Sequence, residues 1–335
     1  MTDSLKRDAC GFVIIGRAGM DLYADPVGTT IESATAFTAA LGGSSANIAA
    51  GLSRQGIRAA LVTCVSDDAI GRFCLAQLAA YGIERQFVRS VGGEARNSLA
   101  VVETRIQDTQ SVIYRNGAAD FEMTEEDVTA LPYHAFQALV TTGTVLAAEP
   151  SRSAAFKAFE MARAAGLPIV FDIDYRPYTW ISAEEAEQVY SHAATFCDII
   201  IGNDEEFGFM AGGYDKGLSK ARALAAKTAR IVVYKMGEKG AITITRDGEL
   251  RTGIFETQAL KPTGAGDAFM AGFLGGLASG FPVFGAIERG SAAAAIVVSR
   301  VGCAPAMPTR DELAQFLSGN TLTDSNEVLD AHFPL

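Results

Sequence analysis

Residues 260–277 read LKPTGAGDAFMAGFLGGL, a glycine-rich turn with one acid, followed by an apolar run of helical length. Glycine lets the backbone turn tightly and leaves its N–H groups open, and the start of the next helix adds the positive end of its dipole. The stretch therefore predicts an anion-binding turn formed by Gly264, Ala265 and Gly266. Asp267, directly behind it, is either a reactive carboxylate or an acid that a helix start favours.

Two common nucleotide-binding motifs do not fit this stretch. A Walker A loop requires G-x-x-x-x-G-K-[ST], a string that the sequence lacks. A dinucleotide-binding fingerprint requires a third glycine or alanine where this chain has Phe269, and it belongs to the first strand–helix unit of its fold. The remaining functional interpretation is a backbone cradle for a phosphoryl group. The Asp267 carboxylate beside it could then take the proton from an attacking hydroxyl.

Short apolar runs bounded by turn residues recur along the chain and alternate with stretches of helical period. Several runs are almost continuously apolar, as strands covered on both faces must be. This alternation predicts an α/β fold with a doubly wound, mostly parallel sheet flanked by helices. The expected strands begin at Phe12, Ala59, Ala138, Pro168, Asp198 and Arg230, and the expected helices include 44–56, 67–82, 151–166, 182–193 and 219–229.

Two stretches, near residues 16–40 and 96–120, interrupt this rhythm because they show partial alternation with little helical period. They predict antiparallel strands outside the main sheet. We interpret them as a small β-sheet lid over the substrate side. Residues 1–320 are expected to form a single domain that includes the lid, and residues 321–335 a polar C-terminal tail.

The composition narrows the class of partner. The chain is 49% hydrophobic and 20% charged, which argues against a mainly disordered protein. A net charge of −11 argues against nucleic acid or an anionic membrane as the main partner and favours small molecules. The five cysteines form no C-x-x-C pair, and the first apolar run is too short for a signal or membrane segment. A reduced, cytoplasmic protein is therefore expected.

Two signatures resemble one known family. TGAGDAF at 263–269 is similar to the second signature of the PfkB/ribokinase carbohydrate kinases, and LGGSSANIAAGLSRQG at 41–56 is similar to the first. Further similar segments follow in the order of that family over nearly the whole chain. The resemblance implies a ribokinase-like fold and an enzyme that transfers a phosphoryl group from ATP, with Mg²⁺, to a carbohydrate alcohol. Asp267 would then be the catalytic base, with residues 264–266 as the cradle of the moving group.

The resemblance also implies roles for residues elsewhere in the chain. Asp21 corresponds to the acid that binds sugar hydroxyls, and Glu206 to the acid that orders Mg²⁺ and its waters. One carboxylate suits Mg²⁺, because this ion keeps most of its waters and takes other ligands from the phosphates. The remaining substrate-binding positions are Gly42, Gly43 and Asn47, and the nucleotide-binding positions are Asn203, Lys235, Gly237 and Ser291.

Several of these residues also have a purely structural explanation. The segment GGSSAN at 42–47 is typical of a helix start capped by Ser44 or Ser45. Both explanations can hold together, since the glycines admit a sugar close to the backbone. Glu206 can be an exposed helix acid, and Lys235 can mark the end of a strand and reach solvent.

Arg176, in the segment DIDYRPYTW, is the best indication of the substrate. Its planar guanidinium suits a carboxylate, which favours a sugar acid over a neutral sugar. Alternatively, Arg176 pairs with Asp172 or Asp174. Together with Lys261, this loop is similar to the branch of the family that phosphorylates 5-dehydro-2-deoxygluconate. The 2-dehydro-3-deoxygluconate kinases and the fructokinases stay open as alternatives.

Lys261 departs from the ribokinase pattern, in which an acid at this position helps to bind a monovalent cation. An ammonium group cannot ligate a cation but can occupy the same electrostatic place, so we expect an enzyme that does not require potassium. The resemblance also implies a homodimer through the lid, whose strands would otherwise be exposed. Two other classes stay open: a non-catalytic sugar-acid or nucleotide sensor on the same fold, and a nicotinamide-dependent oxidoreductase.

Overall fold

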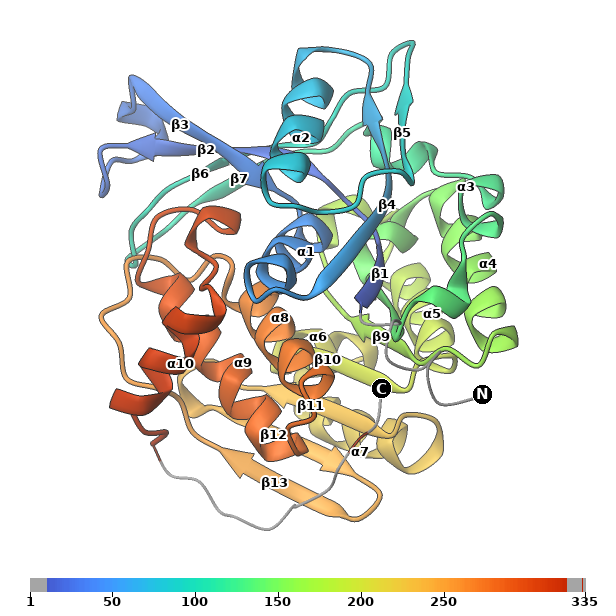
Figure 1. Ribbon diagram of the computed structural model, residues 1–335, viewed down its shortest axis with the longest axis vertical. Helices are drawn as coiled ribbons and strands as arrows, with labels where there is room; N and C mark the ends of the chain where they lie inside the picture. The colour runs from blue at the N-terminus through green and yellow to red at the C-terminus, as the bar shows by residue number, and fades with distance from the viewer. Residues whose placement is uncertain (1–10, 324–332, 334–335) are drawn as a thin grey trace, which may run out of the picture.

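The computed structural model describes residues 11–323 and Phe333 (Figure 1). Its large sheet has the strand order β13-β12-β11-β10-β9-β8-β1-β4-β5. All neighbouring strands from β11 to β5 are parallel, and the edge strands β12 and β13 are antiparallel. The prediction of a mostly parallel sheet is therefore confirmed. The strands are β1 (Gly11–Ile15), β4 (Arg58–Ser66), β5 (Val88–Val91), β8 (Ala138–Thr142), β9 (Ile169–Asp172), β10 (Ile199–Asn203), β11 (Ile231–Lys235), β12 (Ala241–Thr245) and β13 (Gly248–Thr252).

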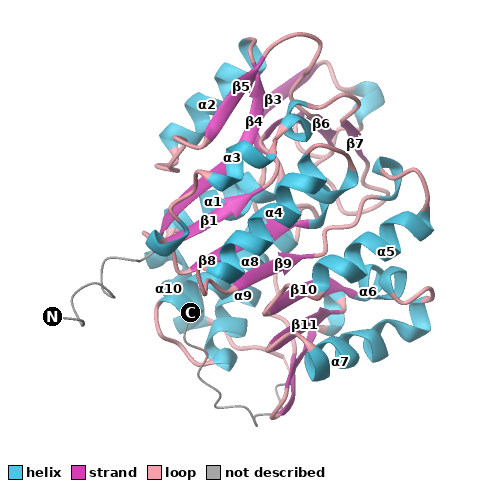
Figure 2. Ribbon diagram, turned by 90° about the vertical axis from the view of Figure 1, so that its right-hand side faces the viewer, coloured by secondary structure: helices cyan, strands magenta, loops and turns pink. Residues whose placement is uncertain are grey.

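Helices cover both faces of this sheet, and Figure 2 looks onto the face that carries α4, α5 and α7. Val13 and Ile15 of β1 point into the core on that face, whereas Phe12 and Ile14 join the core beneath α1 and α8. Strands covered on both faces need apolar residues at every position, which explains the continuous runs. The helices are α1 (Ser44–Arg54), α2 (Ala69–Ala80), α3 (Glu125–Thr129), α4 (Ser151–Ala164), α5 (Ala183–Ala194), α6 (Asp204–Met210), α7 (Gly217–Lys227), α8 (Ala265–Ala278), α9 (Val283–Val298) and α10 (Arg310–Gly319).

The sequence pattern does not predict three strands of the large sheet: β5, β12 and β13. The last two form a hairpin that extends the sheet beside β11. Their sequences, AITIT and GELRT, are short and mix polar with apolar residues. Such segments give a weaker signal than the continuous apolar runs of the central strands.

A second, smaller sheet forms the lid, with the strand order β3-β2-β6-β7. Its strands are β2 (Gly19–Asp25), β3 (Ala36–Gly42), β6 (Leu99–Val102) and β7 (Ser111–Tyr114). Two antiparallel hairpins, β2–β3 and β6–β7, meet through a parallel pair of β2 and β6. The expectation of antiparallel strands is therefore wrong for this central pair. Alternation shows which face of a strand is buried, but the direction of β6 depends on how the chain returns from the large sheet.

The ends of the chain and the cysteines complete the description. The expected tail, 321–335, lies outside the described residues except for 321–323 and Phe333, whose ring packs under the Arg230 guanidinium at 3.9 Å. Cys64, Cys74, Cys197 and Cys303 are buried free thiols. Across the described residues, no helix has both the length and the apolar character needed to cross a bilayer.

Candidate active site

The candidate residues gather where the central parallel strands end. Asp172 ends β9, Asn203 ends β10 and Lys235 ends β11, and Asn203 and Lys235 are paired in register. Neighbouring parallel strands end at the same edge of a sheet, where α/β folds bind ligands. The N-terminal ends of α1 and α8 meet nearby, since Asn47 of α1 contacts Asp267 of α8.

The glycine turn before α8 has the geometry of an anion-binding turn. Gly264 adopts the left-handed conformation, with φ of 87°, and a Cβ there would lie 2.7 Å from the Cys303 Sγ. Ala265 and Gly266 then begin the helix, whose first N–H groups have no partner within it. A Cβ on Gly266 would lie 3.4 Å from the Lys235 Nζ. The Gly266 N–H and the Lys235 ammonium group are thus available to one anion, and the Ala265 N–H is engaged only by a long bond of 3.5 Å to the Pro262 carbonyl oxygen.

Asp267 is oriented by Asn47, a residue of the first signature segment, 41–56. The Asn47 Nδ2 donates a hydrogen bond to the Asp267 Oδ2 at 2.8 Å, although the residues are 220 positions apart. Burial and, to a smaller extent, the charge of Asp174 raise the pKa of Asp267 to about 7, although Asn47, Arg176 and Lys235 oppose the shift. A carboxyl group with a pKa near neutrality can both accept and release a proton at physiological pH.

Close approach of the lid explains the two glycines before α1. A Cβ on Gly42 would lie 1.9 Å from an oxygen of the Asp21 carboxylate, and a Cβ on Gly43 would lie 2.5 Å from the Arg17 carbonyl oxygen. Asp21 itself is buried and accepts a hydrogen bond from the Tyr23 hydroxyl at 3.1 Å. Burial raises the pKa of Asp21, and Arg17 opposes that shift. The structure therefore brings Asp21, Gly42 and Gly43 together.

The expected cap of α1 by Ser44 or Ser45 is wrong. The N-cap residue is Gly43, with φ of 95° and no side-chain cap. Ser44 donates instead to the Asp174 Oδ2 at 2.6 Å, and Ser45 donates to the Ile15 carbonyl oxygen at 3.2 Å. Both hydroxyls donate to residues outside α1, so neither serine accepts a hydrogen bond from the N–H groups of its first turn.

Asn203 and Glu206 close the N-terminus of α6 as a capping box. The Asn203 Oδ1 accepts from the Glu206 N–H at 2.8 Å, and the Glu206 Oε2 accepts from the Asn203 N–H at 2.8 Å. The Glu206 Oε1 also accepts from the Tyr175 N–H, at 3.2 Å. Glu206 is only 8% exposed, so the alternative of an exposed helix acid is wrong. Burial raises its pKa, and Lys235 opposes the shift.

Two further acids lie at the C-terminal end of β9: Asp172 is its last residue and Asp174 follows it, and both are almost fully buried. Burial raises the pKa of Asp172 well above its ordinary value, and Lys235 opposes the shift. Arg176 pairs with Asp174, at 2.7 Å between Nη2 and Oδ1, and donates through Nη1 to the Tyr175 carbonyl oxygen at 2.9 Å. The sequence analysis treated these acids only as partners of Arg176. Two acids directly after a buried strand were the signal that could have placed them in the site.

Lys261 is fully buried beneath the glycine turn. Its Nζ donates to the Thr263 carbonyl oxygen at 2.5 Å and to the Val297 carbonyl oxygen at 3.2 Å. Val297 lies in the last turn of α9, where carbonyl groups lack helical partners and a cation is favourable. The ammonium group thus joins the residue before Gly264 to the C-terminal end of α9.

Two predicted nucleotide-site residues lie apart from this network of contacts. Gly237, with φ of 58°, starts the turn after β11. Ser291 is partly exposed in the middle of α9. In the described part of the chain, neither residue takes part in the hydrogen bonds around Asp267.

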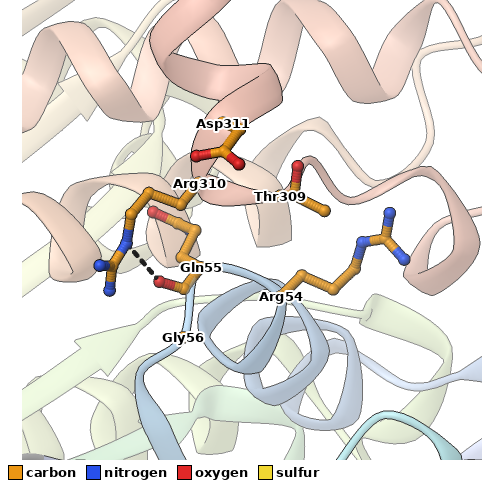
Figure 3. Close-up of a pocket in the computed structure, with 6 residues that line it drawn as sticks. All are labelled: Arg54, Gln55, Gly56, Thr309, Arg310 and Asp311. Atoms are coloured by element: carbon orange, nitrogen blue, oxygen red, sulfur yellow. Dashed lines mark hydrogen bonds between the residues drawn. The ribbon is translucent and has the colours of Figure 1, made fainter.

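A surface hollow of about 350 Å³ lies at the opposite end of α1 (Figure 3). Arg54, Gln55 and Gly56 border it from the end of α1, and the start of α10 closes it, with Arg310 donating to the Gln55 carbonyl oxygen at 3.0 Å. Asn47 is near the other end of this 11-residue helix, and a helix rises about 1.5 Å per residue. The hollow is therefore separate from the candidate active site.

The acids at the site fit Mg²⁺ as an ion that is held partly through water. Within the described residues, no three His, Cys, Asp or Glu side chains are arranged to enclose a metal ion. Both Glu206 oxygens already accept backbone N–H groups, yet each carboxylate oxygen keeps a second lone pair. Such a site suits an ion that retains waters and takes its other ligands from phosphates.

Comparisons with known proteins agree with this arrangement. Residues 11–310 match the pfkB family of carbohydrate kinases. The 5-dehydro-2-deoxygluconokinase of Geobacillus thermodenitrificans is 39% identical over 311 residues, which cover 91% of this chain and 92% of that protein. A PfkB protein from Polaromonas sp. JS666 superposes with a TM-score of 0.80 at 29% identity, covering 91% of this chain and 99% of that one.

A fructokinase from Vibrio cholerae O395, solved with fructose, ADP and calcium, has the same fold, with a TM-score of 0.81 at 24% identity; the match covers 92% of this chain and all of that one. The chain therefore belongs to the pfkB family of carbohydrate kinases. It is a carbohydrate kinase with a ribokinase-like fold, and the resemblance seen in its two signatures is confirmed.

We expect Asp267→Asn to raise the melting temperature most at pH 8 and clearly less at pH 5. The pKa of Asp267 is about 7 in the folded protein, against 3.8 ordinarily. The folded state therefore holds this proton more tightly than the unfolded state, and stability falls as pH rises from about 4 to about 7. Because Asp267 is partly exposed, water screens the charge, and we expect the variant to gain about 1–2 kcal/mol in the free energy of unfolding at pH 8.

Calorimetry at both pH values measures this change in stability. Asp247→Asn, in the exposed β12–β13 turn, is the control, and equal gains at both pH values would contradict the assignment.

Proposed function

We propose that this kinase transfers the terminal phosphoryl group of ATP to the primary hydroxyl of a sugar acid, 5-dehydro-2-deoxy-D-gluconate, giving its 6-phosphate. The observation that carries the proposal is the hydrogen bond between Asn47 and Asp267, which sets a carboxylate with a pKa of about 7 beside an anion-binding turn. The curated relatives that share 37–39% identity over 91% of the chain are named 5-dehydro-2-deoxygluconokinase, which supports the choice of substrate.

The chain's own residues supply a base and a cradle for the transfer. Asp267 takes the proton of the attacking hydroxyl as the oxygen–phosphorus bond forms, and ADP leaves with the former bridging oxygen. The N–H groups of Ala265 and Gly266, with Lys235, stabilise the negative charge on the moving phosphoryl group. Asn47 keeps the carboxylate oriented, since it donates to one oxygen and leaves the other free.

The nucleotide lies along the other side of the turn in this proposal. Lys235 and Asn203 face the phosphates from the ends of β11 and β10, and Gly237 and Ser291 border the nucleoside. Mg²⁺, when bound, neutralises phosphate charge and aligns the nucleotide for in-line transfer. Glu206 orders the waters of that ion, since it is fixed by two backbone N–H groups and cannot swing away.

The sugar side is formed by the lid and the start of α1. Asp21 binds hydroxyls of the substrate, and Gly42 and Gly43 let the sugar lie against the backbone. Arg176 borders the same space, and its side chain is 39% exposed although it is paired with Asp174. A 2-dehydro-3-deoxygluconate kinase or a fructokinase would use the same base and cradle. The relative rates of ADP release with each sugar therefore distinguish the three substrates.

We expect ADP release from ATP and Mg²⁺ to be fastest with 5-dehydro-2-deoxygluconate in a panel that also holds 2-dehydro-3-deoxygluconate, fructose and ribose. Asp267→Asn should lower kcat by roughly 100-fold or more, because general-base catalysis contributes on that order. A coupled assay measures both quantities. Preference for fructose or ribose would contradict the sugar-acid assignment but not the kinase. No turnover with any member, together with tight sugar-acid binding, would favour a sensor.

We also infer that Lys261 replaces a bound monovalent cation. Its ammonium group is fully buried and bonded to two backbone carbonyl oxygens, which are the type of ligand that such a cation takes. Lys261 lies directly before the turn, so its positive charge can stabilise an anion bound there. No dissociable ion is then needed. Burial lowers the pKa of Lys261, whereas the negative charges of Asp267 and Asp21 oppose that shift.

We expect the wild-type turnover to change by less than about 2-fold when potassium is replaced by tetramethylammonium, since Lys261 supplies the charge covalently. Lys261→Met keeps the chain length and removes the charge, and it should lower kcat at saturating substrates. Steady-state assays in matched ionic strength measure both. A large loss of wild-type activity without potassium would show that a cation is still required.

We propose that the protein forms a homodimer through the outer face of the lid. Register places one set of lid side chains on the face away from Asp21 and Tyr23, and it is apolar along all four strands: Leu22, Phe37, Ala39, Leu99, Val101, Val112 and Tyr114. Phe37, Val112 and Tyr114 are exposed. A sheet whose outward face is apolar and exposed is typical of a protein interface, and a second copy can cover that face symmetrically.

We expect Val112→Glu to weaken dimerisation at least 10-fold, because two like charges would meet in an apolar interface. Sedimentation velocity over a range of concentrations measures the change. Ile181→Glu is the control, since Ile181 is a highly exposed apolar residue outside the lid. A wild-type protein that sediments as a monomer, or a variant that stays dimeric, would contradict the proposed interface.

A further inference from the structure

Arg17 is a buried cation with few partners. It lies between β1 and β2 and is 8% exposed. Its only side-chain hydrogen bond in the described structure is a long one, 3.4 Å from Nη1 to the Ser98 Oγ, and its buried Nε has no partner. A guanidinium group has five N–H donors, and leaving them unpaired away from water is costly.

The two neighbouring arginines differ from Arg17 because each has a carboxylate partner. Arg176 pairs with Asp174 at 2.7 Å, and the buried Arg115 pairs with Asp120. Among the described residues, no carboxylate oxygen lies within ion-pair distance of Arg17. Of these three arginines, Arg17 is therefore the one whose charge is not compensated by an ion pair in the described part of the chain.

The surroundings place Arg17 on the sugar side of the site. Its charge acts on both Asp21 of the lid and Asp174 of the strand edge, opposing the effect of burial on each pKa. Its carbonyl oxygen accepts from the Ala46 N–H at 3.2 Å and contacts Gly43, so its backbone is fixed against the start of α1. The guanidinium group therefore lies between the lid and the body of the protein.

We propose that Arg17 binds the carboxylate of the sugar acid and determines the preference for an acid over a neutral sugar. This inference rests on the proposed function and adds a residue that the sequence analysis did not single out. A carboxylate would accept two parallel N–H bonds from the guanidinium and would compensate its charge. The substrate then spans the site, with its acid end at Arg17 and its reactive hydroxyl at Asp267.

Arg176 takes a different role in this arrangement. Its Nη2 is engaged by Asp174 and its Nη1 by the Tyr175 carbonyl oxygen, so its charge is already compensated before substrate binds. It borders the sugar and holds Asp174, whereas Arg17 supplies the free cation.

The test compares gluconate with glucitol, two six-carbon compounds that differ in a carboxylate against a hydroxymethyl group. Calorimetric titration of the full-length protein should show at least 10-fold tighter binding of gluconate, because a charge-assisted hydrogen bond contributes roughly 10- to 100-fold. Arg17→Met should abolish this preference. Arg17→Lys, which keeps the charge without the planar fork, should retain part of it. Arg222→Met, an exposed arginine paired with Glu249, should retain all of it.

A second readout separates ligand binding from a structural role. Because Arg17 is uncompensated in the free protein, Arg17→Met should leave the melting temperature unchanged or raise it, while abolishing the increase that gluconate causes in the wild type. A structural arginine would instead lower the melting temperature when removed. A wild type that binds the two compounds equally, or a variant that keeps the preference, would overturn the proposal.

The same variants distinguish this inference from the proposed function. Arg17→Met should raise KM for 5-dehydro-2-deoxygluconate and leave its kcat within a few-fold, with little change for fructose. Turnover of the sugar acid with an unchanged KM in Arg17→Met would overturn the role of Arg17 and leave the function standing. Selective gluconate binding that depends on Arg17, without any turnover of sugar acids, would refute the function and support Arg17.

Discussion

The burial of several carboxylates close together at one edge of a parallel sheet is the constraint on which this site depends. Burial has the largest effect on the pKa of Asp172, Glu206 and Asp267, and the charge of Asp174 raises all three further. A parallel sheet brings these residues together whatever their charge, because neighbouring strands end side by side. The fold must therefore supply cations at the same edge.

Lys235 and Arg176 meet the need in different ways. Lys235 lies at the end of β11, and its charge opposes the raised pKa of Asp172, Glu206 and Asp267 at once. Arg176 forms its ion pair with Asp174, and its charge also opposes the raised pKa of Glu206 and Asp267. For Asp267, burial has the largest effect, and Asn47, Arg176 and Lys235 oppose it only in part, so the pKa stays near 7. The balance that makes Asp267 usable as a base is thus a property of the whole edge.

The sequence allowed much of this edge to be predicted. Continuous apolar runs located the central strands, whereas Asn203 and Lys235 at their ends were expected as site residues from the family resemblance. The two signatures then identified Asn47 and Asp267, which the structure joins by a hydrogen bond across 220 residues. Periodicity and signatures succeed here because both are local properties of the chain.

Features that depend on contacts between distant segments could not be predicted. Ser44 left its expected capping role because Asp174, 130 residues away, accepts its hydroxyl. Glu206 is buried because the backbone of Tyr175 and Asn203 encloses it. The parallel pairing of β2 with β6, and the isolation of Arg17, likewise depend on where the lid returns to the body. No pattern within a short segment carries that information.

The lid and the anion turn are also in contact, and this contact limits how either can change. The Tyr23 hydroxyl, on the lid strand that carries Asp21, lies 3.1 Å from the Asp21 Oδ2 and 3.2 Å from the Cys303 Sγ. The same sulfur occupies the space where Gly264 would carry a side chain. Packed contacts of this kind deform little, so a shift of the β2 strand displaces the turn as well. The contacts of Cys303 with Tyr23 on one side and Gly264 on the other therefore position the sugar side and the phosphoryl side of the site together.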